Sequence, residues 1–137
     1  MDKKEFILDW IRHAKSDLNT ARHMFEDVYP KETEISAWHS QQCAEKALKA
    51  FLVANDIDPP KIHNLDELDK LCQNIDAGFS EIWGDCQKLN PYGSAVRYPN
   101  ELVVDEAIVQ AAIKRAQKVY DFCVSRINLL PQEETKA

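Results

Sequence analysis

The sequence has 137 residues, of which 45% are hydrophobic and 29% are charged, a composition typical of one globular domain rather than a disordered chain. The formal net charge of −6 disfavours non-specific binding to a nucleic-acid backbone, which requires a basic surface. No apolar run approaches the roughly 20 residues that a membrane span requires. Because the first residues show no secretory signal either, we expect a cytoplasmic protein.

The four cysteines and four histidines show none of the spacings that are typical of metal sites. No two cysteines form a Cys-x-x-Cys pair, and the chain contains no His-Glu-x-x-His sequence. We therefore expect buried free thiols, no metal site and no cofactor. The residues concerned are Cys43, Cys72, Cys86 and Cys123, and His13, His23, His39 and His63.

Prolines divide the chain into segments that mostly have the periodicity of amphipathic helices. Asn64 resembles the cap residue of a capping box completed by Glu67, and Gly84 predicts a bent or short fourth helix. The sequence thus predicts an all-α, up-down bundle of five helices, with residues 1–130 as one domain and 131–137 as a polar tail. The expected helices cover residues 2–27, 32–55, 64–75, 80–89 and 105–128.

Apolar residues on the last expected helix spread over a wide arc, from Ile108 and Ile113 to Tyr120 and Phe122. A helix that is apolar on more than one side has to bury more than one side. Either this helix lies centrally in the bundle, or its second side meets another subunit in a symmetric dimer. The sequence leaves both readings open.

Residues 38–49 read Trp-His-Ser-Gln-Gln-Cys-Ala-Glu-Lys-Ala-Leu-Lys and are the most informative segment of the chain. At about 100° per residue, His39, Gln42, Lys46 and Lys49 form one polar stripe opposite the apolar side of the helix. Their donors suit phosphate or carboxylate groups. A solvated helix face is the alternative, although no matching row of acids accompanies the donors. Gln41 projects towards the apolar side, where an unpaired amide would cost about 1–3 kcal/mol.

Three further polar features are candidates for a site. His63 follows two prolines and directly precedes the third helix, whose free amides attract anions; a capping loop is the alternative. Arg97 offers a planar fork for phosphate, and Tyr98 beside it could stack on a base; a surface loop is the alternative. His13 and Asp17 lie four residues apart on the first helix, and we expect Asp17 to accept a hydrogen bond from another helix.

Four segments of the chain together resemble the HEPN (higher eukaryotes and prokaryotes nucleotide-binding) domain family, and the resemblance covers residues 5–128. In chain order these segments are Asp17-Leu18, residues 38–50, His63-Asn-Leu65 and Arg97-Tyr98-Pro99. The resemblance implies a helical bundle that commonly dimerises. It also implies association with small nucleotidyltransferase-fold proteins in toxin–antitoxin-like pairs. Many members are metal-independent ribonucleases whose hallmark is an arginine followed, after four to six residues, by a histidine.

That ribonuclease motif is absent from this chain, because no arginine has a histidine five to seven positions downstream. After Arg97, for example, these positions hold Leu102, Val103 and Val104. The leading hypothesis is therefore a non-catalytic module that binds a nucleotide or a nucleotidyltransferase-type partner. The residues predicted to bind are His39, Gln42, Lys46, Lys49, His63, Arg97 and Tyr98, and those predicted to have a structural polar role are Asp17, Gln41 and Glu45.

Two alternatives remain at this stage. One is a ribonuclease with a rearranged site, in which His39 or His63 acts as general base and Arg97 stabilises the developing charge. The other is a dimeric scaffold that binds no ligand and uses the polar stripe as its interface.

Overall fold

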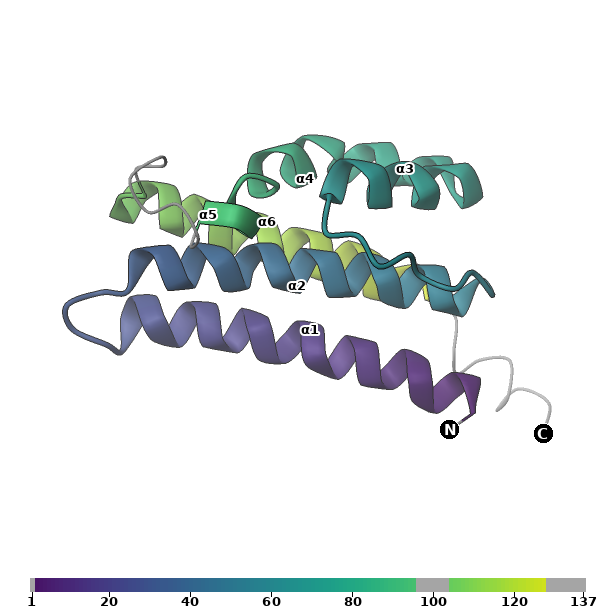
Figure 1. Cartoon of the computed structure of the whole chain (residues 1–137), viewed down its shortest axis with the longest axis horizontal. Helices are drawn as coiled ribbons and strands as arrows, with labels where there is room; N and C mark the ends of the chain where they lie inside the picture. Colours follow the sequence, from purple (N-terminus) through teal and green to yellow (C-terminus); the bar gives the residue numbers. More distant parts are fainter. Residues whose placement is uncertain (1, 96–103, 128–137) are drawn as a thin grey trace.

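The computed structural model describes residues 2–95 and 104–127, and within these ranges every regular element is a helix, so the predicted all-α bundle is confirmed. Helices α1 and α2 run antiparallel side by side, α6 passes behind α2, and α3 and α4 lie on the side of α2 away from α1 (Figure 1). The elements are α1 (Lys3–Glu26), α2 (Thr33–Ala54), α3 (Leu65–Ile75), the 3-10 helix η1 (Ala77–Ile82), α4 (Trp83–Leu89), α5 (Tyr92–Ala95) and α6 (Glu106–Ser125).

Side-chain caps explain where several helices begin. A carboxylate or amide oxygen of the cap residue accepts a backbone N–H of the first turn at 2.8–3.2 Å in four cases, which are Asp2 for α1, Asn64 for α3, Asp76 for η1 and Asp105 for α6. The capping role predicted for Asn64 is therefore confirmed. The predicted fourth helix is divided into η1 and the short α4, and Gly84 lies in the first turn of α4.

Helix α2 lies at the centre of the bundle, where it contacts α1, α3, α4, α5 and α6. Small residues allow α1 and α2 to approach closely, because Ala14 and Ala21 on α1 and Ala37 and Ala44 on α2 are all fully buried. The hydroxyl of Ser36 also donates to the carbonyl oxygen of Ala21 at 2.7 Å across this contact. Most of the surface of α2 is therefore closed to solvent.

Helix α6 has two packed sides. One side contacts α2 and α1, and the other contacts α4 and η1. On the second side, the rings of Phe122 and Phe79 meet edge to face with centroids 4.9 Å apart. Packing within one chain thus accounts for the wide apolar arc of this helix, and the dimer stays a prediction.

The described part of the chain, residues 2–95 and 104–127, has no helix with the length and apolar character that a bilayer span requires. The same residues include no group of three or more His, Cys, Asp or Glu side chains placed to hold a metal ion. The thiols of Cys43, Cys72, Cys86 and Cys123 are free and buried. Burial raises the pKa of all four thiols, so they remain protonated at neutral pH.

One acidic side chain of the core, Asp69 on α3, is only partly satisfied. It is fully buried, and its Oδ2 accepts a hydrogen bond from Gln73 at 2.7 Å. Its Oδ1 is buried without a partner among the described residues. Burial raises the pKa of Asp69 to about 6, against the opposing effect of the Gln73 hydrogen bond.

We predict that Asp69→Asn changes the pH dependence of stability. The folded protein binds the Asp69 proton more tightly than the unfolded chain does, so ionisation of Asp69 costs stability above a pH of about 6. The variant lacks this cost, and its free energy of unfolding relative to the wild type should be highest above pH 6. This advantage should shrink as the pH falls towards 4. Urea unfolding followed by circular dichroism measures the difference at each pH.

The exposed Asp58→Asn is the matched control, and its effect should stay within about 0.5 kcal/mol across the same range. A stability difference for Asp69→Asn that is equal at pH 4 and pH 7.5 would contradict the prediction.

Candidate functional site

Helix α2 exposes only a narrow strip of side chains. The predicted stripe lies along this strip, but it is the edge of a largely buried helix and not a solvated face. His39 and Lys46 have side chains that are 22% and 26% exposed, and Lys49 is nearly buried. Between residues 36 and 53, the side chains that are not buried belong to Trp38, His39, Gln42 and Lys46.

Asp17 on α1 joins two residues of the stripe. Its Oδ1 lies 2.8 Å from His39 Nδ1, and its Oδ2 accepts from Lys46 Nζ at 2.7 Å. His39 and Lys46 are seven residues apart and therefore lie on the same side of α2, two turns apart. One carboxylate thus fixes two donors of α2 against α1.

The ionisation of Asp17 follows from these contacts. Burial alone would raise the pKa of Asp17, but the hydrogen bonds and charges of His39 and Lys46 outweigh burial and lower it below its ordinary value of 3.8. Because the carboxylate is ionised at neutral pH, Nδ1 of His39 is the donor of their hydrogen bond. The other ring nitrogen, Nε2, takes no part in that bond.

Glu45 is the second buried carboxylate, one turn before Lys49 on α2. Its Oε2 accepts from Lys49 Nζ at 3.0 Å and lies 2.9 Å from His63 Nδ1. The side chain of Glu45 is 5% exposed, whereas that of His63 is 76% exposed. His63 therefore extends from the segment before α3 over the buried carboxylate while most of its ring remains in solvent.

The two glutamines of the stripe region connect these groups. Gln41 is fully buried, and its amide donates to the carbonyl oxygen of His63 at 3.1 Å. Gln42 in turn donates to Gln41 Oε1 at 2.8 Å. The Gln41 amide thus has its partners, and it ties α2 to the segment that leads into α3.

Gly93 of α5 packs directly against Gln41. A Cβ at this glycine would lie 3.1 Å from Gln41 Cδ, so the close approach of α5 to α2 depends on the missing side chain. Arg97 and Tyr98, which the sequence predicts to complete the site, follow α5 in the chain and lie outside the described residues.

An aromatic pair continues the strip along α1. Lys49 Nζ lies 5.9 Å from the centroid of the Trp10 ring, and the Trp10 and Phe6 rings meet edge to face at 6.2 Å. Phe6 and Val53 then line a pocket of about 270 Å³ at the end of α2. The polar network and the pocket are thereby connected through side-chain contacts.

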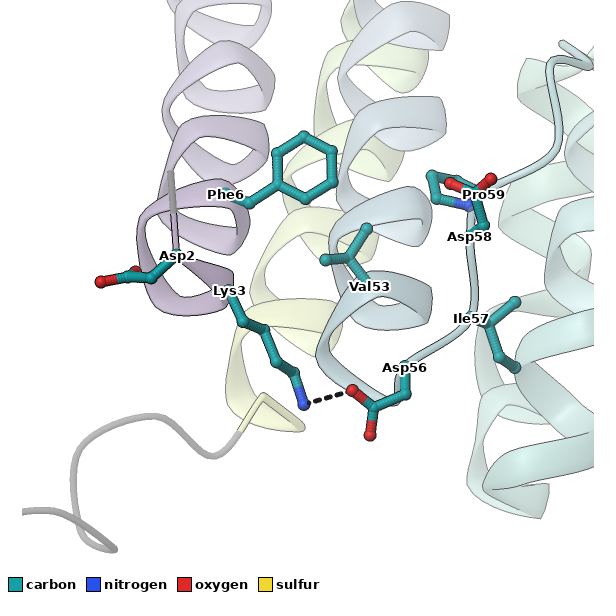
Figure 2. A pocket seen from close by; sticks show the side chains of 8 residues that line it. All are labelled: Asp2, Lys3, Phe6, Val53, Asp56, Ile57, Asp58 and Pro59. Atoms are coloured by element: carbon teal, nitrogen blue, oxygen red, sulfur yellow. Dashed lines mark ion pairs between the residues drawn. The ribbon is translucent and has the colours of Figure 1, made fainter.

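Figure 2 shows this pocket, to which α1, the end of α2 and the following segment contribute. Lys3 and Asp56 form an ion pair of 2.8 Å at its edge. The apolar lining consists of Phe6, Val53, Ile57 and Pro59, and the acidic lining consists of Asp2, Asp56 and Asp58.

Sequence reasoning identified the donors and expected Asp17 to accept a hydrogen bond from another helix, as it does from α2, but it did not identify which donors Asp17 and Glu45 neutralise. The acids come from α1 and from within α2 itself, where Glu45 and Lys49 have the four-residue spacing of a helical ion pair. That spacing was visible in the sequence. The pairing of Asp17 with His39 was not visible in the sequence, since it depends on how α1 and α2 are aligned. His13 instead lies 3.9 Å from Asp9 on its own helix.

Comparison with known proteins gives two matches. A family model described as the HEPN domain matches residues 7–127. The fold is similar to the crystal structure of an archaeal HEPN homologue, with a TM-score of 0.70 and 26% sequence identity over 89% of this chain and 98% of that chain. No curated protein matches the chain.

We predict that Asp17→Asn lowers the free energy of unfolding by about 1.5–3 kcal/mol at neutral pH, because it removes a charged acceptor shared by two donors. The folded pKa of Asp17 lies below its ordinary value of 3.8, so the stabilisation is complete above that value and is lost as the pH falls through the folded pKa. The loss caused by the substitution should therefore shrink in strong acid. Urea unfolding at pH 7 and at the lowest pH where the chain folds tests this.

Asp9→Asn is the control, since Asp9 pairs with Arg12 on the exposed side of α1. Its cost should stay below about 0.5 kcal/mol. An Asp17→Asn cost that does not change with pH would count against the prediction.

Proposed function

Because the chain belongs to the HEPN domain family, we propose that it is a non-catalytic, cytoplasmic partner-binding module of toxin–antitoxin-like type. Its partner is a small nucleotidyltransferase-fold protein, the class that the family resemblance implies. The observation that carries the proposal is a strip whose lysines are already paired with carboxylates within the fold. We name this surface the α1–α2 face, and it comprises Phe6, Trp10, His39, Gln42 and Lys46, with the nearly buried Lys49 beneath it.

The charges of the α1–α2 face are balanced before any ligand binds. Lys46 and Lys49 are neutralised by Asp17 and Glu45 at 2.7 Å and 3.0 Å. A phosphate would have to compete with a largely buried carboxylate for each lysine. A protein partner does not need to displace these contacts, and side chains that are already ordered lose little entropy on binding. The geometry therefore favours a protein partner over a nucleotide at this face.

The pocket beside Phe6 supplies an anchor point for such a partner (Figure 2). Its apolar lining and its volume of about 270 Å³ suit one large apolar side chain. Three carboxylates and one lysine line the pocket, so it favours a partner residue next to Lys or Arg. The proposed partner thus presents an apolar residue flanked by basic ones.

Co-expression with the nucleotidyltransferase-fold product of an adjacent gene tests the proposal. We expect a stable complex on size-exclusion chromatography, and we expect Phe6→Glu to weaken it at least tenfold in calorimetry because it places a charge in the apolar pocket. Leu8→Glu is the matched control, because Leu8 and Phe6 lie on the same helix and are 42% and 39% exposed. Leu8 does not line the pocket.

A complex that forms equally well with Phe6→Glu, or one that Leu8→Glu weakens just as much, would refute the proposed face. Sedimentation of the chain alone tests the dimeric scaffold. A homodimer that Phe6→Glu dissociates, without any complex with the second protein, would favour the scaffold instead. Calorimetry with a nucleotide panel tests the remaining alternative, which is that the α1–α2 face binds a nucleotide.

A second candidate function, ribonuclease activity, has one observation in its favour. His39 and His63 are each held through Nδ1 by a largely buried carboxylate, at 2.8 Å and 2.9 Å. A carboxylate on Nδ1 orients a histidine and leaves Nε2 for proton transfer. Each histidine therefore has the arrangement of a general base, although the arginine-to-histidine motif is absent.

If the chain cleaves RNA, His39→Ala or His63→Ala should reduce the rate at least a hundredfold, within the range of general-base contributions. His13→Ala, on the exposed side of α1, should leave the rate unchanged. Intact RNA after prolonged incubation with the purified chain, or cleavage that survives both substitutions, eliminates this candidate.

A further inference from the structure

Helices α4, α5 and α6 line a cavity of about 220 Å³ that shares no residue with the α1–α2 face. The lining residues of α6 are Ile108, Ala111, Ala112 and Arg115, which are positions i, i+3, i+4 and i+7 of one helix side, so α6 turns that side towards the cavity. The two alanines leave space that longer side chains would fill. Lys88 of α4 and Tyr92 of α5 complete the lining.

The rim of this cavity has an excess of positive charge. Asp85 on α4 is largely buried, and it pairs with both Arg115 at 3.0 Å and Lys118 at 2.9 Å. One carboxylate shared by two cations leaves one positive charge uncompensated. Lys88 adds another, since it pairs with no carboxylate in the described ranges. This excess contrasts with the net charge of −6 of the whole chain.

Asp105, which immediately precedes α6, is the acidic group that acts on Tyr92. Asp105 caps α6 by accepting the backbone N–H of Ile108 at 2.8 Å. Burial raises the pKa of Tyr92, with a smaller opposing effect of Arg115 and a smaller reinforcing effect of Asp105. The phenol is therefore protonated at neutral pH and can donate a hydrogen bond.

Asp85 also fixes the orientation of Arg115. It accepts from Nη1, so the remaining N–H groups of the guanidinium are available to a second acceptor. An arginine held by a buried carboxylate loses little conformational freedom when it binds an anion. The cavity thus offers an ordered arginine, a lysine that pairs with no carboxylate of residues 2–95 and 104–127, a phenol donor and an apolar wall.

We propose that this cavity binds a small organic phosphate, with the phosphate held by Lys88 and Arg115 and the organic part packed against Tyr92 and the two alanines. Arg115 shares Asp85 with Lys118, and Lys88 has no carboxylate partner among the described residues. This cluster, unlike the lysines of the α1–α2 face, therefore keeps a net positive charge that suits the dianion of a phosphate monoester. The volume of about 220 Å³ accommodates a sugar-sized group. The proposal does not depend on the function assigned to the α1–α2 face.

Calorimetry on the full chain with ribose 5-phosphate, ribose and sulfate tests this site. We expect ribose 5-phosphate to bind with a Kd below about 1 mM, ribose to give no signal, and sulfate to bind at least tenfold more weakly. Sulfate binding as strongly as the sugar phosphate, or no binding of the sugar phosphate below about 10 mM, would overturn the proposal.

Substitutions of residues that line the cavity test whether ribose 5-phosphate binds there. Lys88→Ala should weaken ribose 5-phosphate at least tenfold, because it removes one charge-assisted contact. Ala111→Leu should abolish binding by filling the cavity. Lys114→Ala, an exposed position on α6 that does not line the cavity, is the control and should bind as the wild type does. Thermal melts confirm that each variant folds.

Binding that survives both Lys88→Ala and Ala111→Leu would show that the cavity is not the site. Phe6→Glu should leave the affinity for ribose 5-phosphate unchanged, and Lys88→Ala should leave partner binding unchanged. Failure at one surface is therefore distinguishable from failure at the other.

Discussion

The burial of α2 is the constraint on which the rest of the structure depends. Because other helices cover it on most sides, its polar groups have little access to water and need partners inside the protein. Asp17 and Glu45 supply most of these partners: Asp17 accepts from His39 and Lys46, and Glu45 accepts from Lys49, His63 and the two glutamines Gln41 and Gln42. The first network fixes α2 against α1, and the second fixes it against the segment before α3. A shift of α2 along either neighbour would break several charge-assisted bonds together.

The helices and their starts could be predicted because they follow from local rules. Periodicity defines the buried side of each helix, and Asn64 caps the turn that begins beside it in the chain. The contact between Asp17 and His39 could not be predicted in the same way. These residues are 22 positions apart, and their meeting depends on the relative shift of two helices. Small residues such as Ala21 and Ala37 allow the close approach, but they do not reveal this shift.

The two candidate sites differ in the same way, since residues of one could be recognised in the sequence and those of the other could not. The donors of the α1–α2 face could be recognised because they share one helix and repeat with its period. The cavity between α4 and α6 combines Lys88, Tyr92 and Arg115 from three helices, and no single sequence motif contains all three. Its excess charge became visible only once the structure placed two cations on Asp85. Arg97 and Tyr98 stay a prediction, since they lie outside the described residues.

The single-turn helix α5 lies against both regions. Tyr92 lines the cavity with Arg115, and the next residue, Gly93, packs so close to the Gln41 amide that a Cβ there would lie 3.1 Å from Gln41 Cδ. A helix of four residues has almost no stability of its own, so its position is determined by what it touches. Gln41 in turn bonds to the carbonyl oxygen of His63, beside the Glu45 network. The cavity and the α1–α2 face thus share no residue, yet one short element contacts the cavity on one side and the polar network behind that face on the other.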